Sequence, residues 1–340
     1  MFGDDYVENL KELLEEKYNI QILEIEKIKN VYKIKTTSGL KCFKSSKYDL
    51  GQFTFIMSAI KHLMDKGFES VIPYENTVDG EGYIAYNDRY GFLSDWVDAR
   101  EANFKNPIEL KMCVETLSKM HLYSREFELE NGEKGRDYYG KWVKKFKKRC
   151  DELLYFKAII KDKDVQSEFD SIYLKYFDSH YKQGISSVRD LEESEYFRIM
   201  EDHRKTMGFC HHDTANHNFL ISPDFNVYMI DFDYCILDSH LHDLASIIIR
   251  NLRYGNWDME LMEYIIDIYS NRITLTEEEK YLIYCFMEFP QDFWQVGLQY
   301  YVEKQPWEES IFLKRLKKTV EDSRERMEFL KGLKTSLMEV

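Results

Sequence analysis

The sequence predicts an α+β protein in which a small lobe with an antiparallel sheet precedes a larger, mostly helical lobe. Strand-like patterns gather in residues 20–97, and helical periodicity dominates beyond them. The chain of 340 residues, 44% of them hydrophobic, is longer than a single core usually requires and can fill two. We therefore expect one lobe over residues 1–95 and a second over residues 96–340.

The first lobe is expected to start with a helix and continue as a β-meander. Apolar residues of 4–18 fall on one helical stripe. Three strand-like stretches follow, near residues 20–28, 30–37 and 39–45. Alternation along the third strand puts Cys42 and Lys44 on one face and Phe43 on the other. A strand lysine more often faces solvent, but Lys44 shares its face with apolar groups and is a candidate for binding phosphate.

The chain leaves the first lobe through a predicted hairpin. Residues 83–86 and 90–97 have strand character, and Asn87-Asp88 between them has the composition of a tight turn. Beyond this hairpin the pattern becomes helical, including a long charged and tyrosine-rich stretch over residues 125–208. We expect its helices around residues 141–162 and 166–182.

Two short apolar strands with polar residues at their ends form the most informative part of the chain. The first segment, residues 209–221, contains H-x-D-x-x-x-x-N and ends in a strand, and residues 227–233 form a second strand that ends at Asp231. The turn-rich residues 222–226 predict that the strands pair as a hairpin, which would bring Asn218 and Asp231 together. Phosphoryl transfer requires mainly positioning, metal ions and charge stabilisation. Asp213 would orient the attacking hydroxyl, and Asn218 and Asp231 would hold magnesium.

This constellation resembles the aminoglycoside phosphotransferase and choline kinase group, which are protein-kinase-like small-molecule kinases. The resemblance implies a bilobal protein-kinase-like fold, ATP and Mg²⁺ as cofactors, and transfer to the hydroxyl of a small-molecule acceptor. It assigns Asp213, Asn218 and Asp231 to catalysis and Lys44 to phosphate. The backbone near the adenine would come from Ser94, Asp95, Trp96 and Val97.

Two features of active kinases are missing from the sequence. No glycine lies between Gly3 and Gly39, so the loop that normally approaches the phosphates lacks its flexible residues. The predicted helix over residues 51–64 contains no carboxylate to pair with Lys44. Asp49 or Gln52 are the possible substitutes, and a Lys44 held in another way is the third alternative.

Further motifs narrow the resemblance to the CotS-type spore-coat proteins. Residues 138–142 contain a G-K-W segment before the K-R-C of residues 148–150, and residues 275–279 and 289–294 resemble the C-terminal part of that group. The resemblance implies a location in the spore coat and other coat proteins as partners. The alternative function is a structural coat component that keeps the kinase fold without turnover.

Composition excludes several other classes of function. The net charge of −14 disfavours nucleic acid as a partner, because a phosphate backbone requires a basic surface. No run of 18 apolar residues and no secretory signal occur, so we expect cytoplasmic synthesis and no membrane association. The six cysteines have no pairing pattern and are expected to be reduced, buried thiols. The basic run 144–149 predicts a solvated helix face, with an anion site as the alternative.

A metal-dependent phosphohydrolase is the competing enzyme class. Its doublet would be His212-Asp213 or His242-Asp243, with His211, His217 or His203 as further ligands. Strand patterns around the first doublet disfavour this interpretation, and we expect His211 to brace the loop. Asp243 either braces that loop or caps the helix that follows it. His121 lies on an apolar helix face, and we assign it no catalytic role.

Overall fold

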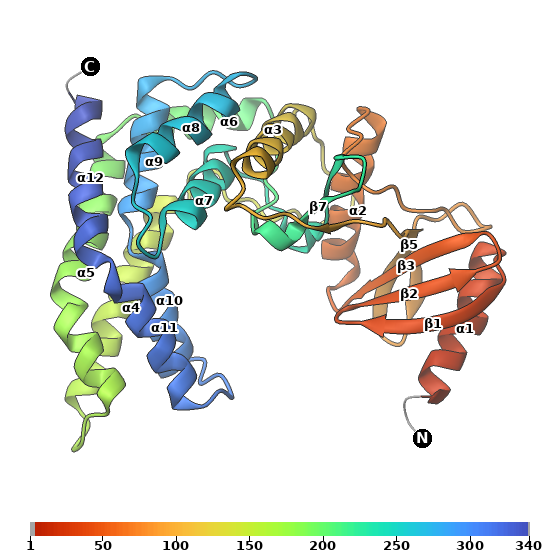
Figure 1. The fold of residues 1–340 in the computed structure, drawn as a ribbon, viewed down its shortest axis with the longest axis horizontal. Coiled ribbons are helices and arrows are strands. Elements are labelled where there is room, and N and C mark those ends of the chain that lie inside the picture. The colour runs from red at the N-terminus through yellow and green to blue at the C-terminus, as the bar shows by residue number, and fades with distance from the viewer. Residues whose placement is uncertain (1–3, 339–340) are drawn as a thin grey trace. The chain divides into compact units, whose positions relative to one another are not determined.

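The computed structural model describes residues 4–338, which divide into two compact units (Figure 1). The first unit contains the described residues up to Arg136 together with Ala215–Ile236. The second unit contains Asp137–Thr214 and the described residues from Leu237 onward. The segment 215–236 therefore returns to the first unit from the middle of the second. The lobe boundary predicted at residue 95 stays a prediction.

The main sheet of the first unit is antiparallel and has the strand order β1-β2-β3-β5-β4. Two helices accompany it, α1 (Asp4–Tyr18) and α2 (Leu50–Asp65). The strands are β1 (Ile22–Ile28), β2 (Val31–Thr36), β3 (Gly39–Ser46), β4 (Ile84–Tyr86) and β5 (Arg89–Asp95). The predicted helix, meander and hairpin are thus confirmed.

Alternation of side chains explains how this sheet buries one face. Phe43 of β3 is fully buried in a core with Ile34 of β2 and with Leu10 and Leu14 of α1. The predicted turn between β4 and β5 has positive φ at both Asn87 and Asp88 (47° and 58°), the backbone of a type I′ hairpin. Asparagine and aspartate tolerate this conformation better than other non-glycine residues, so the turn sets the register of β5.

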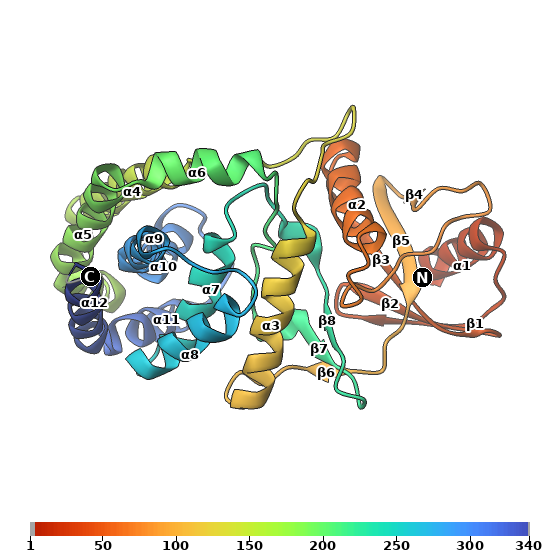
Figure 2. The ribbon, with the colours of Figure 1, turned by 90° about the horizontal axis from the view of Figure 1, so that it is seen from above.

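A second, three-stranded sheet in the first unit has the order β6-β7-β8 (Figure 2). Its strands are β6 (Arg100–Glu101), β7 (Phe219–Ile221) and β8 (Val227–Met229), and helix α3 (Pro107–Tyr123) packs against β8. The 3₁₀ turns η1 (Asn216–Asn218) and η2 (Phe232–Tyr234) precede β7 and follow β8. β7 and β8 form the hairpin that the sequence predicts.

The second unit is built from helices in its described part. These are α4 (Trp142–Lys161), α5 (Glu168–Glu193), α6 (Tyr196–Lys205), α7 (Leu241–Leu252), α8 (Met259–Ser270), α9 (Glu277–Glu288), α10 (Gln291–Tyr301), α11 (Glu309–Glu321) and α12 (Ser323–Met338). α4 and α5 pack side by side and bury aromatic residues against α10 and α11. Reciprocal capping boxes start α5 at Ser167 and α9 at Thr276.

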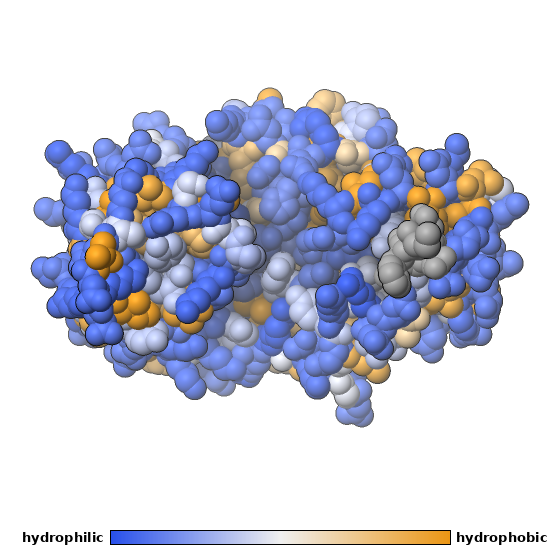
Figure 3. Space-filling view, turned by 90° about the horizontal axis from the view of Figure 1, so that it is seen from below, coloured by the Kyte–Doolittle hydropathy of each residue, from blue (hydrophilic) through white to orange (hydrophobic). Residues whose placement is uncertain are grey.

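Hydrophilic residues cover most of the face of the molecule shown in Figure 3, in keeping with the net charge of −14. Within residues 4–338 no helix has the length and apolar character needed to cross a bilayer. All six cysteines are free thiols, and all but Cys42 are buried, as the sequence predicts.

Candidate functional site

The first unit contains a cavity of about 910 Å³ between its two sheets. Its walls come from the β1–β2 turn, β3, the end of β5, and the segment that follows β8. Apolar residues such as Val71, Phe92 and Met229 lie beside charged ones in this lining. The charged lining residues include Lys44, Arg89, Asp95, Asp231 and Asp233. Apolar walls with a few convergent polar groups are typical of sites for small ligands.

Lys44 extends from β3 into this lining and is held by two carboxylates. Its Nζ donates to Oδ1 of Asp231 at 2.6 Å and to Oδ1 of Asp233 at 2.7 Å, and its side chain is 17% exposed. Burial disfavours the charged ammonium, but the attraction of Asp233 and Asp231 outweighs it and raises the pKa of Lys44 above its ordinary value. Lys44 is therefore a fixed positive charge on the cavity wall.

The partners of Lys44 differ from the substitutes considered from the sequence. Asp49 caps α2 by accepting the backbone N–H of Gln52 at 3.1 Å, and its other oxygen lies 3.2 Å from Nζ of Lys134. The suggestion that Asp49 pairs with Lys44 is wrong, because its carboxylate serves the helix start. The acids after β8 take the place of the missing helix carboxylate.

The β7–β8 hairpin positions Asp231. Phe219 pairs with Met229, and one residue further the N–H of Ile230 donates to the carbonyl oxygen of Asn218 at 3.0 Å. Asn218 and Asp231 thus come to the same end of the hairpin, as predicted. Asp231 has φ 66° and ψ 55°, a left-handed conformation that costs an L-residue roughly 1–2 kcal/mol. Strain of this kind concentrates at functional sites.

Arg136 fixes the turn that carries Asp233. Its Nε donates to the carbonyl oxygen of Cys235 at 3.1 Å, and its guanidinium also donates to the carbonyl oxygen of Asp233. The guanidinium carbon lies 5.6 Å from the ring centroid of Tyr48. Sequence reasoning assigned no role to Asp233 or Arg136. Asp233 could have been found from the sequence, because it is the second acid of the I-D-F-D segment. No motif marks Arg136.

Residues Ser94 to Val97 all line the cavity. Ser94 pairs with Cys42, and the N–H of Trp96 donates to the carbonyl oxygen of Leu40 at 3.0 Å, so both residues direct backbone groups toward β3. Alternation along an antiparallel strand then directs the backbone groups of Asp95 away from β3. Residues 74 and 75 cover part of that edge, since Tyr74 bridges to Ser94 and the N–H of Glu75 donates to the carbonyl oxygen of Leu93 at 2.8 Å.

The side chains at this edge are engaged by lysines of the sheet. The carboxylate of Asp95 lies 2.8 Å from Nζ of Lys41, although 72% of the Asp95 side chain is exposed. Nζ of Lys33 lies 4.8 Å from the ring centroid of Trp96. These contacts hold the side chains at the end of β5 in place.

The β1–β2 turn approaches the same cavity without glycine. Lys29 takes φ 52°, the left-handed backbone that glycine would adopt more easily, and Lys29 and Asn30 both line the cavity. Nζ of Lys29 lies 3.5 Å from Glu101, and 83% of the lysine side chain is exposed. The turn therefore presents an exposed cation where a glycine-rich loop would present backbone amides.

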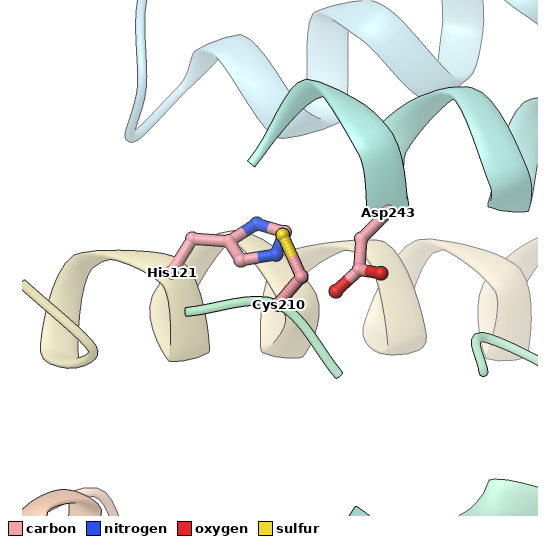
Figure 4. Close-up of side chains that lie close together, drawn as sticks. All are labelled: His121, Cys210 and Asp243. Carbon is pink, nitrogen blue, oxygen red and sulfur yellow. The ribbon is translucent and has the colours of Figure 1, made fainter. Parts of the chain in front are cut away.

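Asp243 braces the loop over residues 209–214 in the second unit. The N–H groups of His211 and His212 donate to its two oxygens at 2.6 and 2.8 Å, and Asp243 is fully buried. Figure 4 shows Asp243 on α7 beside Cys210, which precedes these two residues. Of the two roles considered for Asp243, the structure supports the brace.

Asp213 also lies in the second unit, two residues before the chain returns to the first at Ala215. Nη2 of Arg250 donates to its Oδ1 at 2.7 Å, and its own N–H donates to Nδ1 of His211 at 3.4 Å, so His211 braces the loop as expected. Burial lowers the pKa of Arg250, and the charge of Asp213 counteracts this shift. Arg250 carried no sequence signal beyond being a charge on an apolar helix.

A buried acid, Asp238, lies close to this loop in the same unit, since Sγ of Cys210 lies 3.5 Å from its carbonyl oxygen. Burial raises the pKa of Asp238 to about 7, although the indole N–H of Trp142 and the N–H of Ser239 donate to its oxygens at 3.0 and 2.8 Å. Nδ1 of His242 lies 3.4 Å from Asp238, and burial followed by the nearby His212 lowers the pKa of His242 well below its ordinary value. Burial thus shifts both pKa values in the direction that favours the uncharged acid and the uncharged imidazole.

The basic run 144–149 is only partly the solvated face that the sequence predicts. Lys144, Lys147 and Lys148 are exposed, but Lys145 and Arg149 point inward. Nζ of Lys145 lies 3.3 Å from the ring centroid of Tyr138, and burial lowers its pKa to about 8, with Arg149 adding to the shift. The helix therefore keeps two cations on its inner side.

Solved structures show which fold this arrangement belongs to. An aminoglycoside phosphotransferase from Alicyclobacillus acidocaldarius subsp. acidocaldarius DSM 446 superposes with a TM-score of 0.82 at 20% identity, covering 95% of each chain. A spectinomycin phosphotransferase in complex with ADP and spectinomycin matches with a TM-score of 0.68 at 17% identity, covering 96% of this chain and 98% of the other. An amicoumacin kinase in complex with AMP-PNP and Ca²⁺ matches with a TM-score of 0.61 at 14% identity, covering 96% and 93%. The chain has the aminoglycoside phosphotransferase fold, as predicted.

Sequence comparison identifies the family. Spore coat protein S of Bacillus subtilis (strain 168) is 23% identical over 289 residues, which cover 84% of this chain and 81% of that protein. A family model described as "Spore coat putative kinase YutH" matches residues 11–333. This match covers nearly the whole chain and agrees with the kinase fold and the spore-coat resemblance. The chain therefore belongs to the YutH family of spore coat kinase-like proteins.

Proposed function

We propose that this protein is an ATP- and Mg²⁺-dependent phosphotransferase that acts on a small-molecule hydroxyl in the spore coat. The observation that carries the proposal is the contact of Lys44 with Asp231 on a cavity wall that also contains residues 94–97. A fixed cation, an acid at a strand end and the backbone at the end of β5 are groups that a nucleoside triphosphate would use. The neighbours bound to ADP and AMP-PNP support a nucleotide as the ligand.

The proposed roles follow from the chemistry of each group. Lys44 would pair with the phosphates, and the backbone of residues 94–97 would receive the adenine. Asp213 would accept or orient the proton of the attacking hydroxyl, with Arg250 orienting its carboxylate. Asn218 and Asp231 would hold Mg²⁺, which neutralises charge on the phosphate oxygens. Both offer oxygen donors, the type that Mg²⁺ prefers, and they lie at one end of the β7–β8 hairpin.

Lys44 would have to accommodate the phosphates beside its present partners in this scheme. Its Nζ donates to Oδ1 of both Asp231 and Asp233, so phosphate oxygens would compete with these carboxylates for the lysine. A carboxylate has two oxygens, so Asp231 could bind Mg²⁺ and still contact Lys44. Because Mg²⁺ would offset the repulsion between the acids and the phosphates, metal and nucleotide are expected to bind together more strongly than either does alone.

A structural coat component without turnover is the second candidate function. The lysine-bearing turn at Lys29 and the absence of a carboxylate from residues 51–64 of α2 favour it, because both depart from the pattern of active kinases. In that case the ion pairs of Lys44 would be a permanent feature of the fold. Other coat proteins are the proposed partners under either function.

Calorimetric titration of ATP, with and without Mg²⁺, distinguishes the two. The wild type is expected to bind ATP in a metal-dependent manner, and Asp231→Ala is expected to lose this dependence. Asp224→Ala is the matched control, since Asp224 is an exposed acid in the turn of the same hairpin and lies outside the cavity lining. Absence of ATP binding at millimolar concentration in the wild type contradicts the enzyme proposal and leaves the structural one.

A further inference from the structure

Two histidines and a glutamate converge in the second unit on a point that the phosphotransferase proposal does not use. His203 comes from the last turn of α6, His240 is the N-cap residue of α7, and Glu279 lies in the first turn of α9. One ligand atom from each residue lies within 4.8 Å of the other two. Three elements far apart in sequence thus direct metal-binding atoms at one another.

The outer contacts of these residues orient the ligand atoms. Nδ1 of His203 lies 2.7 Å from Oγ of Ser239, and Nδ1 of His240 lies 3.1 Å from the hydroxyl of Tyr269. Both hydroxyl oxygens can accept an N–H from Nδ1, which would leave each Nε2 as the atom with a lone pair. Imidazole ligands of metals are commonly fixed in this way through their second nitrogen.

The two carboxylate oxygens of Glu279 have different partners. Its Oε2 accepts the backbone N–H of Thr276 at 2.7 Å in the capping box of α9. Its Oε1 lies 2.8 Å from Nε2 of His203 and 3.9 Å from Nε2 of His240. One oxygen therefore serves the helix start, and the other faces both rings.

We infer that His203, His240 and Glu279 form a binding site for a divalent transition metal, with Zn²⁺ as the expected ion. Two imidazole nitrogens and one carboxylate oxygen are a donor set that Zn²⁺ binds with a fourth position left open. Mg²⁺ is not expected there, since it prefers oxygen ligands and several waters. The side chains are 19%, 16% and 9% exposed, so the cluster is shielded yet reachable by an ion.

A hydrogen bond between His203 and Glu279 is the simpler account of part of this geometry. It explains their 2.8 Å separation, but it does not explain why His240 brings its ring within 4.9 Å of the His203 ring. Two imidazoles at this distance with a shared carboxylate are explained by a common cation. The metal would link α6, α7 and α9, so we infer a structural metal site that is independent of the proposed phosphotransfer.

The test is a Zn²⁺ titration of untagged, chelator-treated full-length protein, followed by calorimetry and by competition with a chromophoric chelator. One equivalent is expected to bind to the wild type. His203→Ala and Glu279→Gln are expected to weaken binding by roughly 100-fold or more, beyond the 10–100-fold expected for Tyr269→Phe, which removes only an outer contact. Glutamine is accepted at this position of a capping box, so Glu279→Gln preserves the helix start.

Two control variants and one spectrum make the result decisive. Glu277→Gln changes an exposed carboxylate in the same helical turn, and His217→Ala removes an exposed histidine elsewhere, so both should bind Zn²⁺ like the wild type. Co²⁺ bound to the wild type should give the visible absorption of a four-coordinate nitrogen and oxygen site. The inference is overturned if the wild type does not bind one equivalent of Zn²⁺. It is also overturned if His203→Ala and Glu279→Gln bind Zn²⁺ with the affinity of the wild type. The Co²⁺ spectrum decides the case in which these variants do not fold.

Discussion

Nζ of Lys44 lies 2.6 Å from Oδ1 of Asp231, although 187 residues separate them along the chain. With Asp233 on the other side, the lysine carries two ion pairs, one of them with the acid that the proposed function assigns to magnesium. One positive charge thus faces two negative charges on this wall of the cavity. A ligand with several negative charges must compete with these acids for the lysine, and a divalent cation must bind acids whose charge the lysine already offsets in part.

Replacing Lys44 is expected to affect the binding of ATP and the binding of Mg²⁺ in opposite directions. Lys44→Met is expected to weaken ATP binding at least about tenfold, because a buried charge-assisted contact contributes roughly 1.5–3 kcal/mol. The same variant should bind Mg²⁺ alone more tightly than the wild type, since Asp231 and Asp233 lose their cation. Calorimetry with each ligand measures both effects. Lys35→Met, on an exposed position of β2, should change neither, and unchanged ATP affinity in Lys44→Met would show that Lys44 does not bind phosphate.

Asp243→Asn tests the brace beneath the loop of Asp213. One carboxylate oxygen becomes an amide donor that faces the N–H of His211 or His212, so a buried donor loses its acceptor. We expect unfolding free energy to fall by about 1–3 kcal/mol, measured by denaturant titration. Phosphotransfer should fall further than stability explains, because Asp213 follows directly in the chain. Asp224→Asn is the control, and a variant as stable as the wild type would show that the brace is dispensable.

Arg250 is predicted to position the carboxylate of Asp213. Arg250→Met removes the guanidinium 2.7 Å from that carboxylate, so Asp213 loses the charge-assisted hydrogen bond that orients it. If Asp213 acts as the base, kcat/KM is expected to fall by about tenfold or more, because a hydrogen bond between charged groups contributes roughly 1.5–3 kcal/mol. Arg272→Met changes an exposed arginine and should keep the kcat/KM of the wild type. Equal kcat/KM in the wild type and Arg250→Met would contradict a role for Arg250 in positioning Asp213.

The buried Asp238 predicts a pH-dependent stability with a defined sign. Burial raises its pKa in the folded state to about 7, whereas the unfolded value is about 3.9, so folding takes up a proton between these values. Its contribution is complete below about pH 4 and is lost as the pH rises to about 7, by at most about 1.4 kcal/mol per pH unit. The unfolding free energy of the wild type minus that of Asp238→Asn should therefore decline from pH 4 to 7 and level off above.

Denaturant titrations at intervals of one pH unit measure this difference. His242 titrates in both proteins, so its effect largely cancels in the subtraction. Asp224→Asn should run parallel to the wild type at every pH. A difference between wild type and Asp238→Asn that is independent of pH would mean that Asp238 is ionised in the folded protein.

The local elements were predictable because their signals lie within a few neighbouring residues. Alternating strands set the β1–β2–β3 meander, turn chemistry at Asn87 and Asp88 set the β4–β5 hairpin, and a capping box started α9. The hairpin that carries Asn218 and Asp231 was predicted on the same basis. Steric preference and short-range hydrogen bonding decide such elements before any long-range contact forms.

The partners of the site residues could not be predicted in this way. The sequence by itself determined the fold class, the family and the positions of Lys44, Asp213, Asn218 and Asp231 as candidates. Only the tertiary structure decided that Lys44 is held by Asp231 and Asp233 and that Arg250 holds Asp213. It also decided which cations of the 144–149 run are half-buried and that His203 contacts Glu279. The physical reason is that these contacts join residues distant in sequence, and their geometry depends on the packing of whole helices and sheets, which no local pattern records.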